Sequence, residues 1–379
     1  MAPPTLLSQA RACLTPLGSV PTLAIVSGDG PYLWDEAGRR YLDVASGLGG
    51  NLLGHDAVVL ASALGSAGRL PLALPEEAID EGGAQLTSWF VQNSFADQVI
   101  LTSDAAEARR VAFEVIRRYR RAREEARDEI LVVGPPPESE TADGQRRLFA
   151  YDDRASMAAA LSERTSAVLY APSLAVPASV CPGAEELEEL KEMARAARAL
   201  FVVDESGVPW GRSGRCFVWQ STTARPDLAV VGAGMAAGQP FGAVLLSRDL
   251  GRFCAKQGCG AGRRSSSLAN ALALATLRDV QERALFRTAE KVARVLAREL
   301  SRIAVDFPCV LDTTAAGLLH VLTVGTKRDD ILNSCRARGL LLATGGDDTL
   351  LILPSLDLTR GHAKALASVL REALAEVAG

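Results

Sequence analysis

Short apolar runs alternate with helix-like patterns through the middle of the chain. Six of these runs have the length and composition of buried strands: Val99–Thr102, Ile130–Val133, Ala167–Ala171, Leu200–Val203, Leu228–Val231 and Ala243–Leu246. Alternation of this kind is typical of a largely parallel sheet with helices on its faces. We therefore expect a central α/β unit.

The segments between these runs predict amphipathic helices. The clearest one follows the first run, where a single apolar stripe is formed by Ala108, Val111, Ala112, Val115, Ile116 and Tyr119. Its other face carries arginines that we expect to be solvated: Arg109, Arg110, Arg117, Arg118, Arg120 and Arg121. A second helix is predicted over about 184–199.

The last third of the chain has a different order of elements. The pattern is helical with few breaks over 268–303, strand-like at 317–324, 340–343 and 350–353, and helical again over 360–377. This predicts a second, α+β unit. We divide the chain into an N-terminal segment that packs with the small domain (1–50), a large α/β domain (51–265) and a C-terminal α+β domain (266–379).

Composition narrows the class of protein. With 48% hydrophobic and 23% charged residues, the chain has the balance of a soluble globular protein. A net charge of −4 gives no sign of nucleic-acid binding. The uncharged stretch 228–247 contains four glycines and a proline, which predicts two buried strands around a turn and no membrane span.

The cysteines and histidines do not form a metal motif. The seven cysteines are scattered and contain no CxxC pair, and Cys254 and Cys259 lack neighbouring ligands. We expect reduced thiols in a cytoplasmic protein, and the N-terminus has no secretory signal pattern.

Three predicted strand ends are followed by residues suited to a binding site. In open parallel sheets, ligands bind outside the carboxyl ends of the strands. The first predicted strand leads into 103–107 and a helix, the fourth into Asp204 and Glu205, and the fifth into the small-residue run 232–238. We expect the functional site at this edge.

Several motifs in this order resemble the class III aminotransferases, pyridoxal-phosphate enzymes of fold type I such as acetylornithine aminotransferase. The motifs are Gly30–Asp43, Asn51–His55, Phe201–Glu205, Gly211–Gly214, Phe217–Gln220, Pro226–Asp227, Pro240–Ala243 and Leu274–Leu277. The resemblance implies a large domain with a central, mostly parallel sheet, a smaller α+β domain, and a dimer.

The lysine that forms the Schiff base in this family is replaced in our alignment. Matching Pro226-Asp227 and Pro240 without a gap puts Ala233 at the lysine position, and no lysine lies between Lys191 and Lys256. Alanine offers no amine for covalent catalysis. We therefore expect no catalytic residue at this position.

The segment that holds the phosphate in the family is also altered. Asp104-Ala105-Ala106 stands in place of Ser-Gly-Thr or Ser-Gly-Ala. A carboxylate about 4 Å from a phosphate costs roughly 4 kcal/mol per charge pair at an effective dielectric near 20, more than the helix dipole returns. We expect Asp104 to cap the helix, with Glu107 completing a capping box.

Other family positions differ as well. Gly134–Pro137 stands where the family has an aromatic residue that stacks on the ring. Ala171 stands at the position of a family glutamate, Gly207 at that of a glutamine, and Leu351 at that of an arginine. The family's threonine that reaches the partner subunit's phosphate would fall near Gly262. Asp204 alone matches, at the aspartate that pairs with the pyridine nitrogen. We name Asp104, Ala105, Ala106, Asp204, Gly207 and Ala233 the vestigial pocket, with no metal and no cofactor expected in it.

These differences lead to two hypotheses about function. The first is an inactive pseudoenzyme that acts through protein–protein contacts, as a scaffold, regulator or inactive partner subunit. The alternative is an aminotransferase-like enzyme, or a metabolite sensor, that binds pyridoxal or pyridoxamine phosphate or another small molecule non-covalently. Asp204, Asp104, Arg212 or Cys259 would then act. In both cases we expect a homodimer, or a heterodimer with a related chain, with contacts around 51–60.

Overall fold

A mixed sheet of seven strands forms the centre of the molecule. The computed structural model describes residues 5–15, 20–55, 61, 63, 65, 71, 74–75, 77–134, 146–174, 176–259 and 262–378. The sheet order is β4-β10-β9-β8-β7-β5-β6, and only β10 runs antiparallel to its neighbours. The strands are β4 (Gln98–Thr102), β5 (Glu129–Val133), β6 (Arg146–Phe149), β7 (Thr165–Tyr170), β8 (Leu200–Asp204), β9 (Leu228–Val231) and β10 (Gly242–Leu246).

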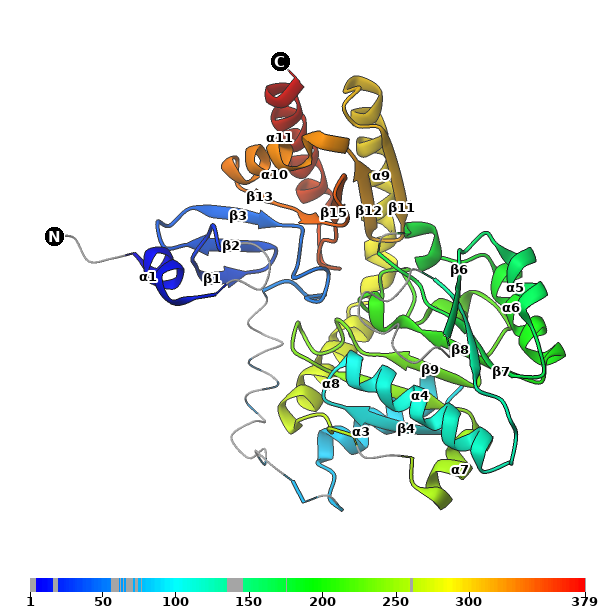
Figure 1. Ribbon diagram of the computed structural model, residues 1–379. Coiled ribbons are helices and arrows are strands. Elements are labelled where there is room, and N and C mark those ends of the chain that lie inside the picture. Colours follow the sequence, from blue (N-terminus) through cyan, green and yellow to red (C-terminus); the bar gives the residue numbers. More distant parts are fainter. Residues whose placement is uncertain are drawn as a thin grey trace.

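Helices cover both faces of this sheet (Figure 1). They are α3 (Glu81–Asn93), α4 (Ala105–Arg121), α5 (Arg154–Ala160), α6 (Ala184–Ala196), α7 (Arg248–Gln257) and α8 (Ser267–Glu282). Side chains of α4 and α7 pack on one face of the strands, and those of α3, α5, α6 and α8 pack on the other. In β8, Val202 belongs to the α4 side, while Phe201 and Val203 belong to the opposite side. Because successive strand residues point to opposite faces, a continuous apolar run buries both.

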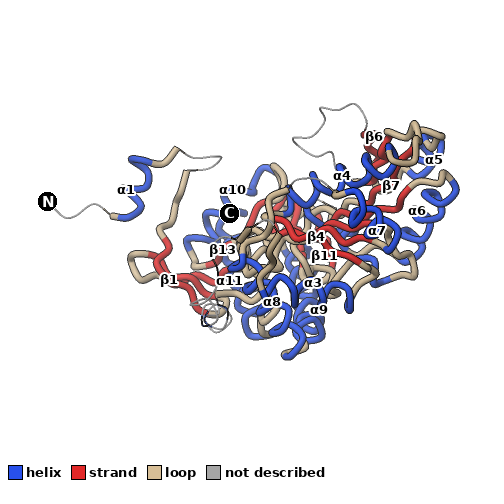
Figure 2. Tube along the Cα trace, turned by 90° about the horizontal axis from the view of Figure 1, so that it is seen from below, coloured by secondary structure: helices blue, strands red, loops and turns tan. Residues whose placement is uncertain are grey.

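A second unit combines the C-terminal third with the N-terminal strands (Figures 1 and 2). One four-stranded sheet has the order β1-β2-β3-β13 and the other the order β11-β12-β15-β14. The strands are β1 (Ile25–Asp29), β2 (Tyr32–Asp35), β3 (Arg40–Asp43), β11 (Asp312–Ala316), β12 (Leu319–Thr323), β13 (Leu340–Leu341), β14 (Ala343–Thr344) and β15 (Thr349–Ile352). The helices are α9 (Leu285–Asp306), α10 (Arg328–Ala337) and α11 (Arg360–Ala378), with α1 (Leu6–Cys13) at the N-terminal end. β3 pairs in parallel with β13, which joins the two ends of the chain.

Most predicted elements are confirmed. All six apolar runs are strands, the stripe over 108–119 lies on α4, and the stretch 228–247 forms β9 and β10 around a turn. Among the described residues, no helix is long and apolar enough to cross a membrane. The long helical region divides into α8 and α9 at Ala284, which adopts a left-handed conformation. β6 and β11 were not predicted, because each contains charged or small polar residues in place of an apolar run.

Two expectations about polar residues are wrong. The arginines of α4 are not uniformly solvated, since the Arg120 side chain is 5% exposed and donates to the carbonyl of Ser166. The expectation of reduced thiols fails at Cys254 and Cys259, which form a disulfide with a Cα–Cα distance of 4.8 Å. Cys254 lies in the last turn of α7 and Cys259 follows five residues later, so the end of the helix brings the two sulfur atoms together.

Candidate active site

The carboxyl ends of the parallel strands meet at one edge of the central sheet. Thr102, Asp204 and Val231 end β4, β8 and β9, and each is followed by a segment singled out in the sequence. Ligands of open α/β sheets bind at this edge. The structure therefore brings together Asp104, Asp204 and Ala233 on neighbouring loops.

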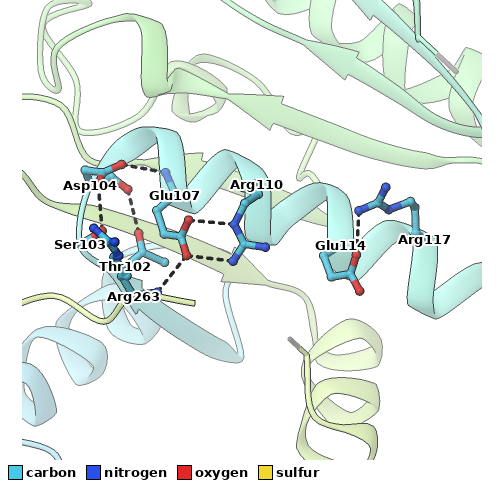
Figure 3. A network of polar contacts seen from close by, with 8 residues as sticks. All are labelled: Thr102, Ser103, Asp104, Glu107, Arg110, Glu114, Arg117 and Arg263. Atoms are coloured by element: carbon cyan, nitrogen blue, oxygen red, sulfur yellow. Dashed lines mark hydrogen bonds and ion pairs between the residues drawn. The ribbon is translucent and has the colours of Figure 1, made fainter. Parts of the chain in front are cut away.

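The N-terminus of α4 is closed by its own side chains (Figure 3). Asp104 is the N-cap, and its Oδ1 accepts the backbone N–H of Glu107 at 2.8 Å, which confirms the predicted cap. The hydroxyl of Ser103 donates to Asp104 Oδ2 at 2.9 Å, and that of Thr102 donates to the Asp104 carbonyl at 2.9 Å. The carboxylate thus occupies the place that an anion takes at an open helix N-terminus.

Glu107 does not complete the predicted capping box. Its carboxylate accepts two hydrogen bonds from Arg110 and one, at 2.8 Å, from the backbone N–H of Arg263 (Figure 3). Hydrogen bonding to Arg110, opposed by partial burial, lowers the pKa of Glu107 to about 2. The carbonyl of Arg263 accepts the N–H of Ser103 at 2.7 Å, so the segment that follows Gly262 lies directly against the start of α4.

Asp204 is buried and paired with an arginine of α4. Its side chain is 4% exposed, and Oδ2 accepts Arg109 Nε at 2.7 Å. Arg109 also donates to the hydroxyl of Ser206 at 2.6 Å, while Asp204 Oδ1 accepts the backbone N–H of Ser206 at 2.9 Å. Arg109 was not among the predicted site residues, because the arginine face of α4 was expected to be solvated. A signal was present, since Arg109 precedes Ala112 by three residues and Ile116 by seven, at the margin of the apolar stripe.

Glu205 is a second buried carboxyl, which the sequence placed at this strand end without assigning it a role of its own. It is 6% exposed and accepts the backbone N–H of Val218 at 2.9 Å. Burial raises the pKa of Glu205 to about 8. The side chain is therefore mostly protonated at neutral pH, which limits the negative charge beside Asp204.

The loop after β9 carries Ala233 in a tightly packed setting. The carbonyl of Ala233 accepts the backbone N–H of Trp210 at 2.6 Å. A Cβ added to Gly232 would lie 2.3 Å from the carbonyl oxygen of Phe241, so that position admits only glycine. These two backbone contacts hold the loop against Trp210 and Phe241.

The remaining sequence-predicted positions are spread around the edge. Gly134 adjoins Ala171, whose carbonyl accepts the hydroxyl of Tyr151, while residues 135–137 lie outside the described residues. Gly207 ends a 3₁₀ turn (Glu205–Gly207) and is exposed. Leu351 is 2% exposed and belongs to an apolar cluster that also contains Val180 and Val208, where the second unit packs against the segment after β8.

Two other residues considered as acting groups have structural roles. Cys259 is held in the disulfide and offers no free thiol. Arg212 is 1% exposed and donates to the carbonyls of Gly49 and Pro354, which ties three loops together. Burial lowers the pKa of Arg212 to about 9.

A cavity of about 880 Å³ runs along β4 from Gln98 to Thr102, and its lining does not include Asp104, Asp204 or Ala233. Its lining includes Thr102, Val111, Asn270 and the segment 262–267. In the part of the chain that the structure describes, no three His, Cys, Asp or Glu side chains gather as a metal site.

Comparisons with known proteins identify the family. The family model for class-III aminotransferases matches residues 134–374. The chain is 28% identical over 352 residues to the acetylornithine aminotransferase of Gloeobacter violaceus, with 87% of each chain covered. It is 26% identical over 357 residues to that of Agrobacterium fabrum, covering 89% of this chain and 90% of the relative. This chain belongs to the class-III aminotransferase family.

Solved structures agree with this assignment at the level of the fold. The N-acetylornithine aminotransferase of Stenotrophomonas maltophilia superposes with a TM-score of 0.84 at 23% identity, over 98% of this chain and 99% of that one. An ornithine aminotransferase of Toxoplasma gondii, with PLP partially occupying its active site, superposes with a TM-score of 0.85 at 21% identity, over 97% of this chain and 93% of that one. The fold is therefore that of the pyridoxal-phosphate-dependent transferases of fold type I.

The hypothesis of an inactive pseudoenzyme without cofactor is contradicted by these findings. The relatives of this chain are named aminotransferases and match it over nearly their whole length. Class-III aminotransferases depend on pyridoxal phosphate. The inference failed because single side-chain losses describe individual contacts, whereas a cofactor is held by many.

The residues of this site match the ring of the cofactor but not its covalent attachment or its phosphate. Asp204 supplies a buried carboxylate for a ring nitrogen, and each of its oxygens can accept a second hydrogen bond. Ala233 supplies no amine, and Asp104 places a carboxylate at the helix N-terminus. The site thus fits the ring but not a covalent bond at position 233, and we derive no catalytic step through the cofactor.

Proposed function

We propose that this chain is an aminotransferase-family enzyme that acts without a covalent bond between a lysine and pyridoxal phosphate. The observation that carries the proposal is Asp204, a buried carboxylate at the carboxyl end of β8 within the motif Phe201–Glu205. A carboxylate at this place holds a ring nitrogen in its protonated form, because opposite charges favour each other in a buried site. When bound, a pyridoxal cofactor supplies the electron-withdrawing ring needed for amino-group exchange.

The proposed placement of Ala233 at the lysine position determines how the cofactor is held. Without the amine, only non-covalent contacts remain for binding. Pyridoxamine phosphate already carries its amino group and needs no lysine, so we expect it to bind better than pyridoxal phosphate. Asp204 is the contact that this chain provides toward the ring.

We also propose that the protein is a homodimer. The family is typically homodimeric, and two-fold pairing is the commonest closed assembly. Of the predicted contact segment 51–60, residues 56–60 lie outside the described residues. A heterodimer with a related chain and a cytoplasmic location stay predictions from the sequence.

A binding titration followed by a half-reaction tests the proposed function. Purified protein is titrated with pyridoxamine phosphate by calorimetry, and the complex is then mixed with a 2-oxo acid while formation of pyridoxal phosphate is followed by absorbance. We expect saturable binding and conversion by the wild type. Asp204→Ala should lose both, while Asp249→Asn, at an exposed aspartate on α7, should change neither. Absence of binding by the wild type would overturn the proposal.

A further inference from the structure

Arg109 already satisfies the charge of Asp204. Its Nε lies 2.7 Å from Asp204 Oδ2, and the carboxylate is 4% exposed. A buried carboxylate is stable only with a partner, because water no longer compensates its charge. In this structure that partner is a guanidinium, the same sign of charge that a protonated ring nitrogen would bring.

The arginine is held in this position from two sides. It donates to Asp204 and also, through its terminal nitrogen, to the hydroxyl of Ser206 at 2.6 Å. The backbone N–H of Ser206 in turn donates to Asp204 Oδ1 at 2.9 Å. The three groups form a closed set of hydrogen bonds across α4 and the turn after β8.

We propose that Arg109 is an internal competitor for Asp204, which a pyridoxal-type ligand must displace or outcompete in order to bind. This inference rests on the proposed function, since it assumes that Asp204 faces the ligand's ring nitrogen. Two cations at one carboxylate repel each other, and the pair Arg109–Asp204 is lost or weakened when the ring nitrogen arrives. The ion pair thus sets the affinity of the site.

The proposal has a direct consequence for a variant that lacks the competing charge. In Arg109→Gln, Asp204 is left buried without its cation, so a ligand that brings a positive ring nitrogen gains the full ion-pair interaction. We expect this variant to bind pyridoxamine phosphate at least about tenfold more tightly than the wild type, which corresponds to about 1.4 kcal/mol. Arg109→Lys keeps a positive charge and should stay close to the wild type.

Calorimetric titration with pyridoxamine phosphate tests this on five proteins: the wild type, R109Q, R109K, the double variant R109Q/D204N and R117Q. Arg117 is a matched control, because it is an exposed arginine of α4 paired with Glu114. The gain should appear in R109Q, vanish in R109Q/D204N, and be absent from R117Q. Thermal melting of each variant shows that it is folded, and R109K provides the comparison should R109Q be unstable.

The outcomes separate this inference from the proposed function. If the wild type binds and R109Q binds no more tightly, the competitor role is overturned while the proposed function stands. If R109Q binds and the wild type does not, the competitor role is supported and the proposed function of the native chain fails. If no variant binds, both are overturned.

Discussion

The carboxylate of Asp104 and the backbone N–H of Glu107 lie 2.8 Å apart at the first turn of α4. The helix is therefore capped by a charged side chain at the point where an anion would otherwise bind. Asp104→Ala should lower the free energy of unfolding by about 1 kcal/mol, because one N–H of the first turn loses its acceptor. Asp104→Asn keeps an acceptor and should remain within a few tenths of the wild type by chemical denaturation.

The same pair of variants separates capping from charge. Asp104→Asn removes the negative charge near the expected phosphate while the helix stays capped. We expect it to bind pyridoxamine phosphate at least about tenfold more tightly, since repulsion between charges about 4 Å apart is worth several kcal/mol in a partly buried site. Equal affinities in calorimetry would show that the phosphate lies elsewhere.

Arg109 and Asp204 should be energetically coupled. Each single variant, Arg109→Gln or Asp204→Asn, leaves its partner without a counter-charge, while the double variant removes both. We expect a coupling energy of about 1–3 kcal/mol in a double-mutant cycle of unfolding free energies. The exposed pair of Arg117 and Glu114, treated in the same way, should give less than about 1 kcal/mol. Similar values for the two pairs would contradict the buried ion pair.

Glu205 should make the protein less stable as pH rises. Burial raises its pKa from 4.5 to about 8, so the folded state holds a proton that the unfolded state releases. The stabilising contribution is complete below about pH 4.5 and is lost as pH rises toward about 8. Glu205→Gln keeps an acceptor for the Val218 N–H and cannot ionise. The difference between the melting temperatures of Glu205→Gln and the wild type should therefore shift in favour of the variant between pH 5 and pH 8. A difference that stays constant over this range would show that Glu205 is ionised in the folded protein.

The disulfide between Cys254 and Cys259 should contribute to stability. It closes a short loop between α7 and the segment that leads to Arg263, and closure of a loop of this size is worth about 2 kcal/mol. Replacing both cysteines by alanine should lower the melting temperature in the absence of reductant. A dithiol reductant should lower the melting temperature of the wild type to that of the double alanine variant. Cys13→Ala, which changes an exposed free cysteine, should melt at the wild-type temperature with and without reductant. A wild-type melting temperature that is insensitive to reductant would contradict the disulfide.

Much of the fold could be predicted because apolar periodicity is a local signal. The buried strands of the central sheet, such as β8, have almost no polar residues, and α4 has one continuous stripe. β6 was missed because an edge strand with two arginines lacks that signal. The disulfide was missed because scattered cysteines give no pairing until a turn places them together.

The candidate site was predicted only in part. Asp104 and Asp204 stand next to strand ends, where a sequence motif can be read directly. Arg109 and Glu205 acquire their roles from tertiary contacts, with Asp204 and with the N–H of Val218. The inference of an inactive protein treated each lost side chain as decisive, although a site is formed by many contacts.

The covalent state of the bound cofactor distinguishes a Schiff-base enzyme from one that holds the cofactor by non-covalent contacts. The protein is saturated with pyridoxal phosphate, treated with borohydride to fix any Schiff base, and mapped by peptide mass spectrometry, with Ala233→Lys as the positive control. We expect a stoichiometric adduct at position 233 of the control. In the wild type we expect bound cofactor without a stoichiometric adduct on any of its five lysines, Lys191, Lys256, Lys291, Lys327 and Lys364. A single fully modified lysine in the wild type would contradict non-covalent binding of the cofactor.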